Sequence, residues 1–172
     1  MATNQNISQA LRRVKQLKGR MAELSLRAAG SVSHTKDEAP AFDFTVTRAE
    51  IASVRGELVA LEAAVAVANA TTAIEFEGKT LTLAAAIRQL QEYKAEMAWL
   101  SQLRLQSGTF VSREAEYDEA TGRHVTRKVE TTFVSHLSEQ ARVAEIDQLR
   151  ERFAALNDLV ESANHRTSVT LS

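Results

Sequence analysis

Hydrophobic residues recur three and four positions apart along most of this chain, a spacing that places side chains on one face of an α-helix. The pattern covers residues 6–29, a second segment from Thr47 to a break at Asn69, and residues 81–106 and 135–164. Thr47 and Glu50 have the form of a capping box, so we expect the second helix to begin there. In the first segment the heptad positions hold Ile7, Ala10, Val14, Leu17, Met21, Leu24 and Ala28. We therefore predict an all-α, coiled-coil-like antiparallel four-helix bundle.

The second and fourth segments repeat one another. Residues 51–74 align without gaps with residues 146–169, and residues 10–24 align with 86–100. The identities in the longer match are Ile51/Ile146, Arg55/Arg150, Ala60/Ala155, Leu61/Leu156, Val65/Val160, Ala68/Ala163, Asn69/Asn164 and Thr72/Thr167. Heptads can look alike by chance, but periodicity does not demand the shared Arg and Asn. We predict a duplicated helical hairpin, with repeats over about 6–76 and 81–171.

An insertion distinguishes the second repeat from the first. Over residues 109–134 the pattern changes to β-branched and aromatic residues, and Val125, Val129 and Phe133 share one side of an extended strand. We expect Val111 and Ala115 to stand opposite them on the partner strand. The residues from Asp118 to Gly122 supply a turn. We predict a β-hairpin between the third and fourth helices. Because an isolated hairpin is marginally stable, it should pack on the helices or on another subunit.

Composition supports one helical domain spanning residues 1–172. Hydrophobic residues make up 44% of the chain and aromatic residues 5%, with one Pro and six Gly to interrupt helices. The net charge of −1 creates no strong overall field, and the absence of Cys excludes disulfides and thiol catalysis. The first eight residues lack the apolar core of a signal peptide, and no apolar run is long enough to span a membrane. We expect a soluble cytoplasmic protein.

The repeated Ala-Asn-x-x-Thr break gives a candidate polar site at the helix ends, formed by Asn69, Thr72, Asn164 and Thr167. Two interpretations apply. The Asn residues could end the helices in the left-handed conformation and cap open carbonyls, or both ends could converge on a pseudo-symmetric polar site. Capping is favoured because it requires no ligand.

The sequence shows no pattern typical of catalysis. Its four histidines have no metal-ligand spacing, no Ser lies in a nucleophile elbow, and no Gly-rich phosphate loop is present. We therefore predict no metal, no cofactor and no enzymatic activity.

The predicted hairpin carries both basic and acidic residues. Its basic residues are Arg113, Arg123, His124, Arg127 and Lys128. Its acidic residues are Glu114, Glu116, Asp118, Glu119 and Glu130. A basic hairpin can contact a nucleic-acid backbone, which leaves a nucleic-acid-binding module as an alternative. The interleaved acids favour cross-strand ion pairs instead, so a nucleic-acid partner is not expected.

Several hydrophobic residues lie off the predicted core stripes and form a candidate interface. They are Trp99, Leu103, Val59, Val67, Phe110, Tyr117 and Val125. A Trp off the stripe is typical of an interface anchor, and exposed strand edges can pair with another chain. We predict a non-enzymatic module for assembly or protein–protein interaction that forms a homo-oligomer.

The order of these motifs resembles a known family. The motifs are the Ala- and Arg-rich first helix (Ala10–Leu24), Pro40 with Phe42, the Ala-Asn-x-x-Thr break, Gly78–Leu81, Ser112–Glu114 and the final Asn164. Together they resemble the septicolysin-like family of small bacterial helical proteins, whose function is uncharacterised. The family name implies a membrane-active cytolysin, which is a second alternative.

Overall fold

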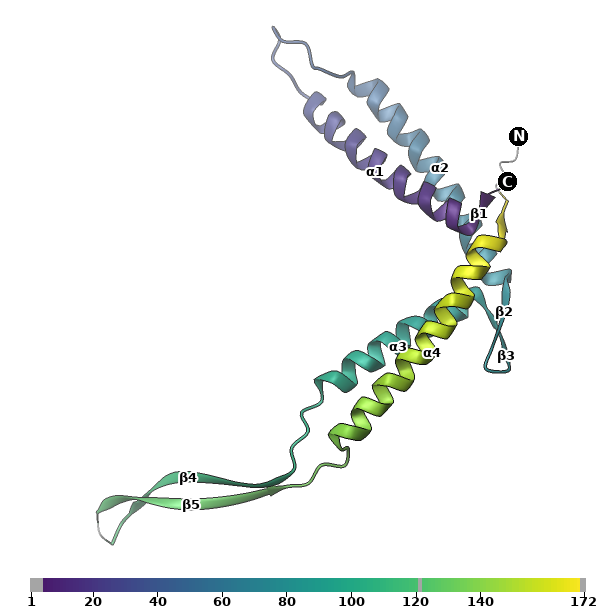
Figure 1. Cartoon of the computed structure of the whole chain (residues 1–172). Helices are drawn as coiled ribbons and strands as arrows, with labels where there is room; N and C mark the ends of the chain where they lie inside the picture. The colour runs from purple at the N-terminus through teal and green to yellow at the C-terminus, as the bar shows by residue number, and fades with distance from the viewer. Residues whose placement is uncertain (1–4, 121, 171–172) are drawn as a thin grey trace. The chain divides into compact units, whose positions relative to one another are not determined.

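The computed structural model describes residues 5–120 and 122–170 and is mostly helical (Figure 1). Its helices are α1 (Ile7–Ser31), α2 (Phe44–Thr71), α3 (Leu83–Gln102) and α4 (Glu139–Arg166). Its strands are β1 (Gln5–Asn6), β2 (Ala73–Phe76), β3 (Lys79–Thr82), β4 (Gly108–Asp118), β5 (Arg123–Phe133) and β6 (Ser168–Val169). The four predicted helices and the hairpin between α3 and α4 are confirmed, whereas the all-α class is wrong because strands flank the helices.

The helices contact each other in two pairs, α1 with α2 and α3 with α4. The chain forms two compact units, one of Met1–Gln91 with Ala154–Ser172 and one of Glu92–Phe153. Both α3 and α4 cross the boundary and contribute to each unit. The prediction of a single domain with all four helices in one bundle stays a prediction.

The pair formed by α1 and α2 buries the predicted stripe. In α1 the buried side chains are Ile7, Ala10, Val14, Leu17, Leu24, Ala28 and Ser31. In α2 they are Thr47, Val54, Leu58, Leu61, Val65 and Ala68. Ion pairs between exposed side chains flank this seam, including Arg13–Glu57 and Lys18–Glu62, each at 2.8 Å. Exposed pairs contribute little, so buried apolar area is what holds this pair together.

The beginning of α2 differs from the prediction. The Asp43 side chain accepts a hydrogen bond from the Val46 N–H at 2.9 Å and caps the helix. Thr47, predicted to begin the helix with a capping box, lies inside it, and its hydroxyl donates to the Asp43 carbonyl at 2.7 Å. An Asp cap one turn earlier satisfies the first N–H groups, so the capping-box prediction is wrong.

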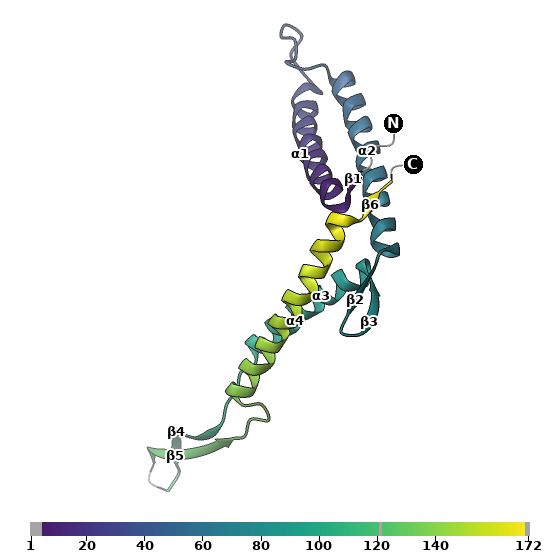
Figure 2. The same ribbon diagram turned by 45° about the vertical axis from the view of Figure 1, so that its right-hand side comes forward.

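The second pair, α3 with α4, lies side by side in both views (Figures 1 and 2). Buried side chains recur along both helices: Leu83, Ala86, Leu90, Tyr93 and Leu100 of α3, and Ile146, Leu149, Leu156, Val160 and Ala163 of α4. Two cation–π contacts at 5.1 Å join the helices, Lys94 over Phe153 and Arg152 over Tyr93. The Ser138 hydroxyl accepts from the Ala141 N–H and caps α4.

Two very short antiparallel sheets lie at the ends of the helices. In one, β2 pairs with β3 through a turn in which Glu77 and Gly78 both have positive φ, 50° and 73°. Two consecutive positive φ values are typical of a type I′ hairpin turn. In the other, β1 pairs with β6, so the two ends of the described chain lie side by side.

The third sheet is an 11-residue ribbon of β4 and β5, whose register pairs Asp118 with Arg123 and Gly108 with Phe133. Phe110, Val125, Val129 and Phe133 share one side, hereafter the apolar face, because side chains alternate along a strand. Val111 and Ala115, expected opposite the valines, stand instead opposite Glu130 and Thr126 on the other side. The four-residue loop after Asp118 fixes this register.

Candidate interaction surfaces

The polar residues of the two helix ends come together in part. The Thr72 hydroxyl donates to the Thr167 hydroxyl at 3.5 Å, and the N–H groups of these residues donate to the Ala68 and Ala163 carbonyls, each at 2.9 Å. Each Thr therefore closes the last turn of its helix in the same way. The convergence of the two ends that the repeat predicted is present at the threonines.

The Asn residues of the break do not cap the helices. Asn69 lies inside α2 and Asn164 inside α4, and neither has a positive φ. The Oδ1 atoms of both are buried and accept no hydrogen bond from the described residues. The capping interpretation is therefore wrong, because Thr72 and Thr167 occupy the end positions. A buried acceptor without a donor costs about 1–3 kcal/mol.

The same two helix ends share a set of backbone hydrogen bonds. The Ile7 N–H, at the start of α1, donates to the Thr167 carbonyl at 3.1 Å. The Leu83 N–H, at the start of α3, donates to the Thr72 carbonyl at 2.8 Å. The donors are offset by 76 residues and the acceptors by 95, as in the sequence repeat. The side chains of Asn6 and Thr82, just before these donors, cap α1 and α3.

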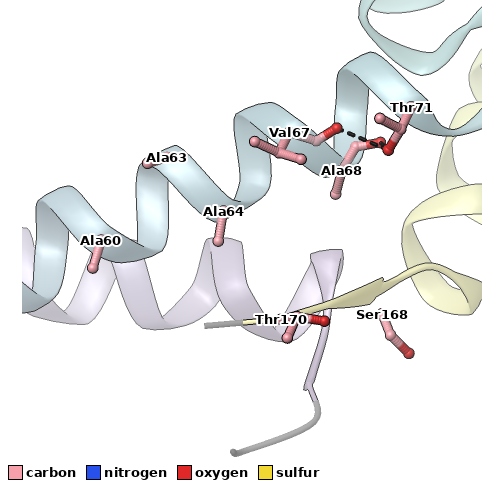
Figure 3. Close-up of a pocket in the computed structure, with 8 residues that line it drawn as sticks. All are labelled: Ala60, Ala63, Ala64, Val67, Ala68, Thr71, Ser168 and Thr170. Atoms are coloured by element: carbon pink, nitrogen blue, oxygen red, sulfur yellow. Dashed lines mark hydrogen bonds between the residues drawn. The ribbon is translucent and has the colours of Figure 1, made fainter. Parts of the chain in front are cut away.

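A shallow hollow of about 460 Å³ lies on α2 beside the C-terminal strand (Figure 3). It is lined by Ala60, Ala63, Ala64, Val67, Ala68, Thr71, Ser168 and Thr170. Figure 3 shows that the α2 residues in this lining are small, with the Thr71 hydroxyl turned back to the Val67 carbonyl at 2.9 Å. The lining has no charged side chain, and its polar groups are the hydroxyls of Thr71, Ser168 and Thr170.

Three predicted interface residues on the helices are exposed. Trp99 on α3 is 59% exposed, and Val59 and Val67 on α2 are 61% and 64% exposed. Leu103 is half-buried just after α3, and its carbonyl accepts from Arg142 at 3.1 Å. Trp99 thus leaves a large aromatic surface in solvent, as an interface anchor would.

The β4–β5 ribbon has the largest share of exposed apolar side chains. Every residue of β4 is exposed except the half-buried Asp118, and every residue of β5 except the half-buried Val129. Predicted interface residues Phe110, Tyr117 and Val125 are 53%, 57% and 43% exposed. Phe110 contacts Phe133 edge to face, with ring centroids 5.5 Å apart. No element of the described chain therefore covers the apolar face.

Charges on the ribbon are paired unevenly. Arg127 forms the expected kind of cross-strand ion pair with Glu116 at 3.6 Å. On the side opposite the apolar face, Arg113 stands across from Lys128, a like-charge pair that destabilises the ribbon. No ion pair joins Lys128 to another described residue.

Among the residues that the structure describes, no three His, Asp or Glu side chains gather as a metal site would require. Within the same ranges, no helix combines the length and apolar character that crossing a bilayer demands.

The elements together define a class of protein, helical hairpins linked by small sheets and carrying an exposed β-ribbon. A solved structure of this class is described as a functionally unknown conserved protein from Corynebacterium diphtheriae. The two share 12% identity with a TM-score of 0.69, over 97% of this chain and 99% of that one, which shows a common fold. Neither family models nor curated proteins give a match, so the septicolysin-like resemblance stays a prediction.

Proposed function

We propose that this protein is a non-enzymatic assembly module that associates with further copies of itself through exposed apolar surfaces. The observation that carries the proposal is the uncovered β4–β5 ribbon, with Phe110 53% and Phe133 39% exposed on one face. A two-stranded ribbon is marginal in water by itself, whereas three or more strands with an apolar face are stable. Association with another copy would supply the additional strands that stabilise the ribbon.

The exposed residues on the helices support the same proposal. Val59 and Val67 are eight residues apart, so they lie on one side of α2, next to small Ala side chains that let another backbone approach. Trp99 adds an aromatic anchor on α3. Contiguous exposed apolar side chains typically mark protein interaction sites.

We also propose that the chain derives from a duplicated helical hairpin. The support is the matched set of caps and hydrogen bonds at Asn6 and Thr82, and at Thr72 and Thr167. Burial follows the repeat as well, with Leu61 at 1% and Leu156 at 0% exposure. The two repeats thus share buried core positions and helix-end hydrogen bonds. These shared features serve packing, which fits an assembly module rather than an enzyme.

Sedimentation velocity tests this function. We expect the average sedimentation coefficient to rise from low to high micromolar concentrations of the unmodified protein. A single monomeric species at tens of micromolar would contradict self-association.

A further inference from the structure

We propose that two copies pair the free edges of their β5 strands. The strands run antiparallel and are centred on Val129, and they form a four-stranded sheet in the order β4–β5–β5–β4. This inference rests on the proposed self-association and specifies its surface and register. Both edges of the ribbon are open. They differ in which side chains come to stand opposite each other when the same edge of two copies pairs across a two-fold axis.

The β5 edge is self-complementary in this register. A two-fold axis perpendicular to the sheet at Val129 sets Lys128 of each copy opposite Glu130 of the other, giving two pairs of opposite charge. These two side chains lie on the same side of the ribbon, because they are two residues apart. Within its own chain Lys128 stands opposite Arg113 and Glu130 opposite Val111, so neither has an oppositely charged cross-strand partner there.

The same register extends the apolar face. Val125 of one copy stands opposite Phe133 of the other, and Val129 meets its own copy at the axis. Aromatic and β-branched residues directly across from one another are among the favourable cross-strand pairs. The edge-to-face contact of Phe133 with Phe110 continues the row into β4. The two ribbons thereby become one sheet, whose one side carries Val125, Val129, Phe133 and Phe110 of both copies together with the ion-paired Arg127 and Glu116.

Neighbouring registers of β5 are unfavourable. An axis at Lys128 or at Arg127 sets that cation against its own copy, and an axis at Glu130 does the same with a carboxylate. Axes near the middle of the β4 edge have the same difficulty. Axes at Arg113 and Glu114 oppose like charges, and an axis at Ala115 sets Glu114 against Glu116. Among the axes from Arg127 to Glu130, the one at Val129 alone sets opposite charges across from each other, which favours this centre on β5.

Charge reversal tests the register. Lys128→Glu and Glu130→Lys each replace both attractive pairs with repulsive ones, so we expect each variant alone to dimerise about tenfold to thirtyfold more weakly in sedimentation equilibrium. An equimolar mixture of the two variants sets the carboxylates of one copy against the ammonium groups of the other. We expect the mixture, and the double variant Lys128→Glu/Glu130→Lys, to regain association near that of the unmodified protein.

Loss of the ribbon does not explain the expected result. Lys128→Glu replaces the like-charge pair with Arg113 by an attractive one, so it favours pairing of β4 with β5 within the chain. Recovery in a mixture of two weakly associating proteins would also not follow if either ribbon had unfolded.

Cysteine cross-linking gives an independent measurement, because the chain has no cysteine of its own. Opposed residues of antiparallel strands have Cα atoms about 4.5–5.5 Å apart, within disulfide range. Mild oxidation of Val129→Cys should therefore give a covalent dimer. The matched control is Val111→Cys, which also replaces a valine of the ribbon, but on β4. In the four-stranded sheet the two β4 strands are about 14 Å apart, too far for a disulfide.

The outcomes separate the register from the function. A protein that remains monomeric overturns both proposals. Association that is unchanged by either reversal, that does not recover in the mixture, or that gives no Val129→Cys dimer overturns the β5 register and leaves self-association standing. Growth into ever larger polymers also overturns the register, because in the proposed dimer each copy's β5 edge is already paired and assembly stops at two copies.

Discussion

Asn6 gives the sharpest single test of how the chain closes its ends, because its side chain makes two different contacts. Its Oδ1 accepts from the Gln9 N–H at 2.8 Å and caps α1, and its Nδ2 donates to the His165 carbonyl at 3.1 Å, near the end of α4. Asn6→Ala removes both contacts, whereas Asn6→Ser keeps the cap and removes the contact to His165. Thr82 is the equivalent cap of α3, and its hydroxyl accepts from the Ala85 N–H at 3.2 Å. Unlike Asn6, its side chain forms no second hydrogen bond with a described residue.

The expected costs follow from these contacts. A lost N-cap costs about 1 kcal/mol and a lost neutral hydrogen bond about 1 kcal/mol of unfolding free energy. Asn6→Ala should therefore lower the free energy of unfolding by about 2 kcal/mol, and Asn6→Ser and Thr82→Ala by about 1 kcal/mol each. Urea unfolding followed by far-ultraviolet circular dichroism measures these differences.

Equal effects of Asn6→Ala and Asn6→Ser would refute the reasoning, because the cap would then contribute nothing. An Asn6→Ser variant as stable as the unmodified protein would show that the contact to His165 contributes nothing. Hydrogen exchange at the β1–β6 pair provides a local measurement of the same change, since opening of that pair should become faster in Asn6→Ala.

Three further predictions follow from the fold. Leu61→Ala and Leu156→Ala, at equivalent buried positions, should each lower the unfolding free energy by about 2–5 kcal/mol in urea titrations. If one of the two substitutions left the unfolding free energy unchanged, the two positions would not be equivalent. Gly78→Ala, at a φ of +73°, should cost about 1–2 kcal/mol, whereas Gly56→Ala inside α2, with open space at its Cβ, should stabilise by about 0.5–1 kcal/mol. Melting temperatures that move in the same direction would be inconsistent with this contrast. Because the proposed charge pairs are exposed, raising salt from low to molar concentration should weaken dimerisation in sedimentation equilibrium, and stronger association would argue for a purely apolar contact.

The helices could be predicted because their stability depends on buried stripes that the sequence shows directly. The heptad positions of α1, from Ile7 to Ala28, are buried almost throughout. Helix starts were harder to predict. Thr47 with Glu50 has the form of a capping box, but Asp43 supplies an equivalent oxygen one turn earlier, so the sequence offers two starting points for the same helix.

The short sheets could not be predicted from periodicity, because two to four residues are too few to show alternation. Gly78 was the available signal for the β2–β3 turn. The sheet of β1 and β6 joins residues far apart in sequence and carries no local signal. The apolar side of β5 was predicted from Val125, Val129 and Phe133, but the partner register was not, since it depends on the loop length after Asp118.

The candidate polar site was predicted in part. The repeat indicated that Thr72 and Thr167 would share a role, and their hydroxyls meet. The repeat did not indicate which residue of each break ends the helix, because Asn and Thr both suit such positions. Continuing each helix past Asn69 and Asn164 buries their side-chain oxygens.

Hydrogen–deuterium exchange of the unmodified protein, compared between low and high micromolar concentration, tests the central claim most directly. If the copies meet at the ribbon, backbone amides of β5 should exchange more slowly at the higher concentration, while those of α1 keep the same rates. Protection that rises with concentration only on the helices, or nowhere, would contradict the account.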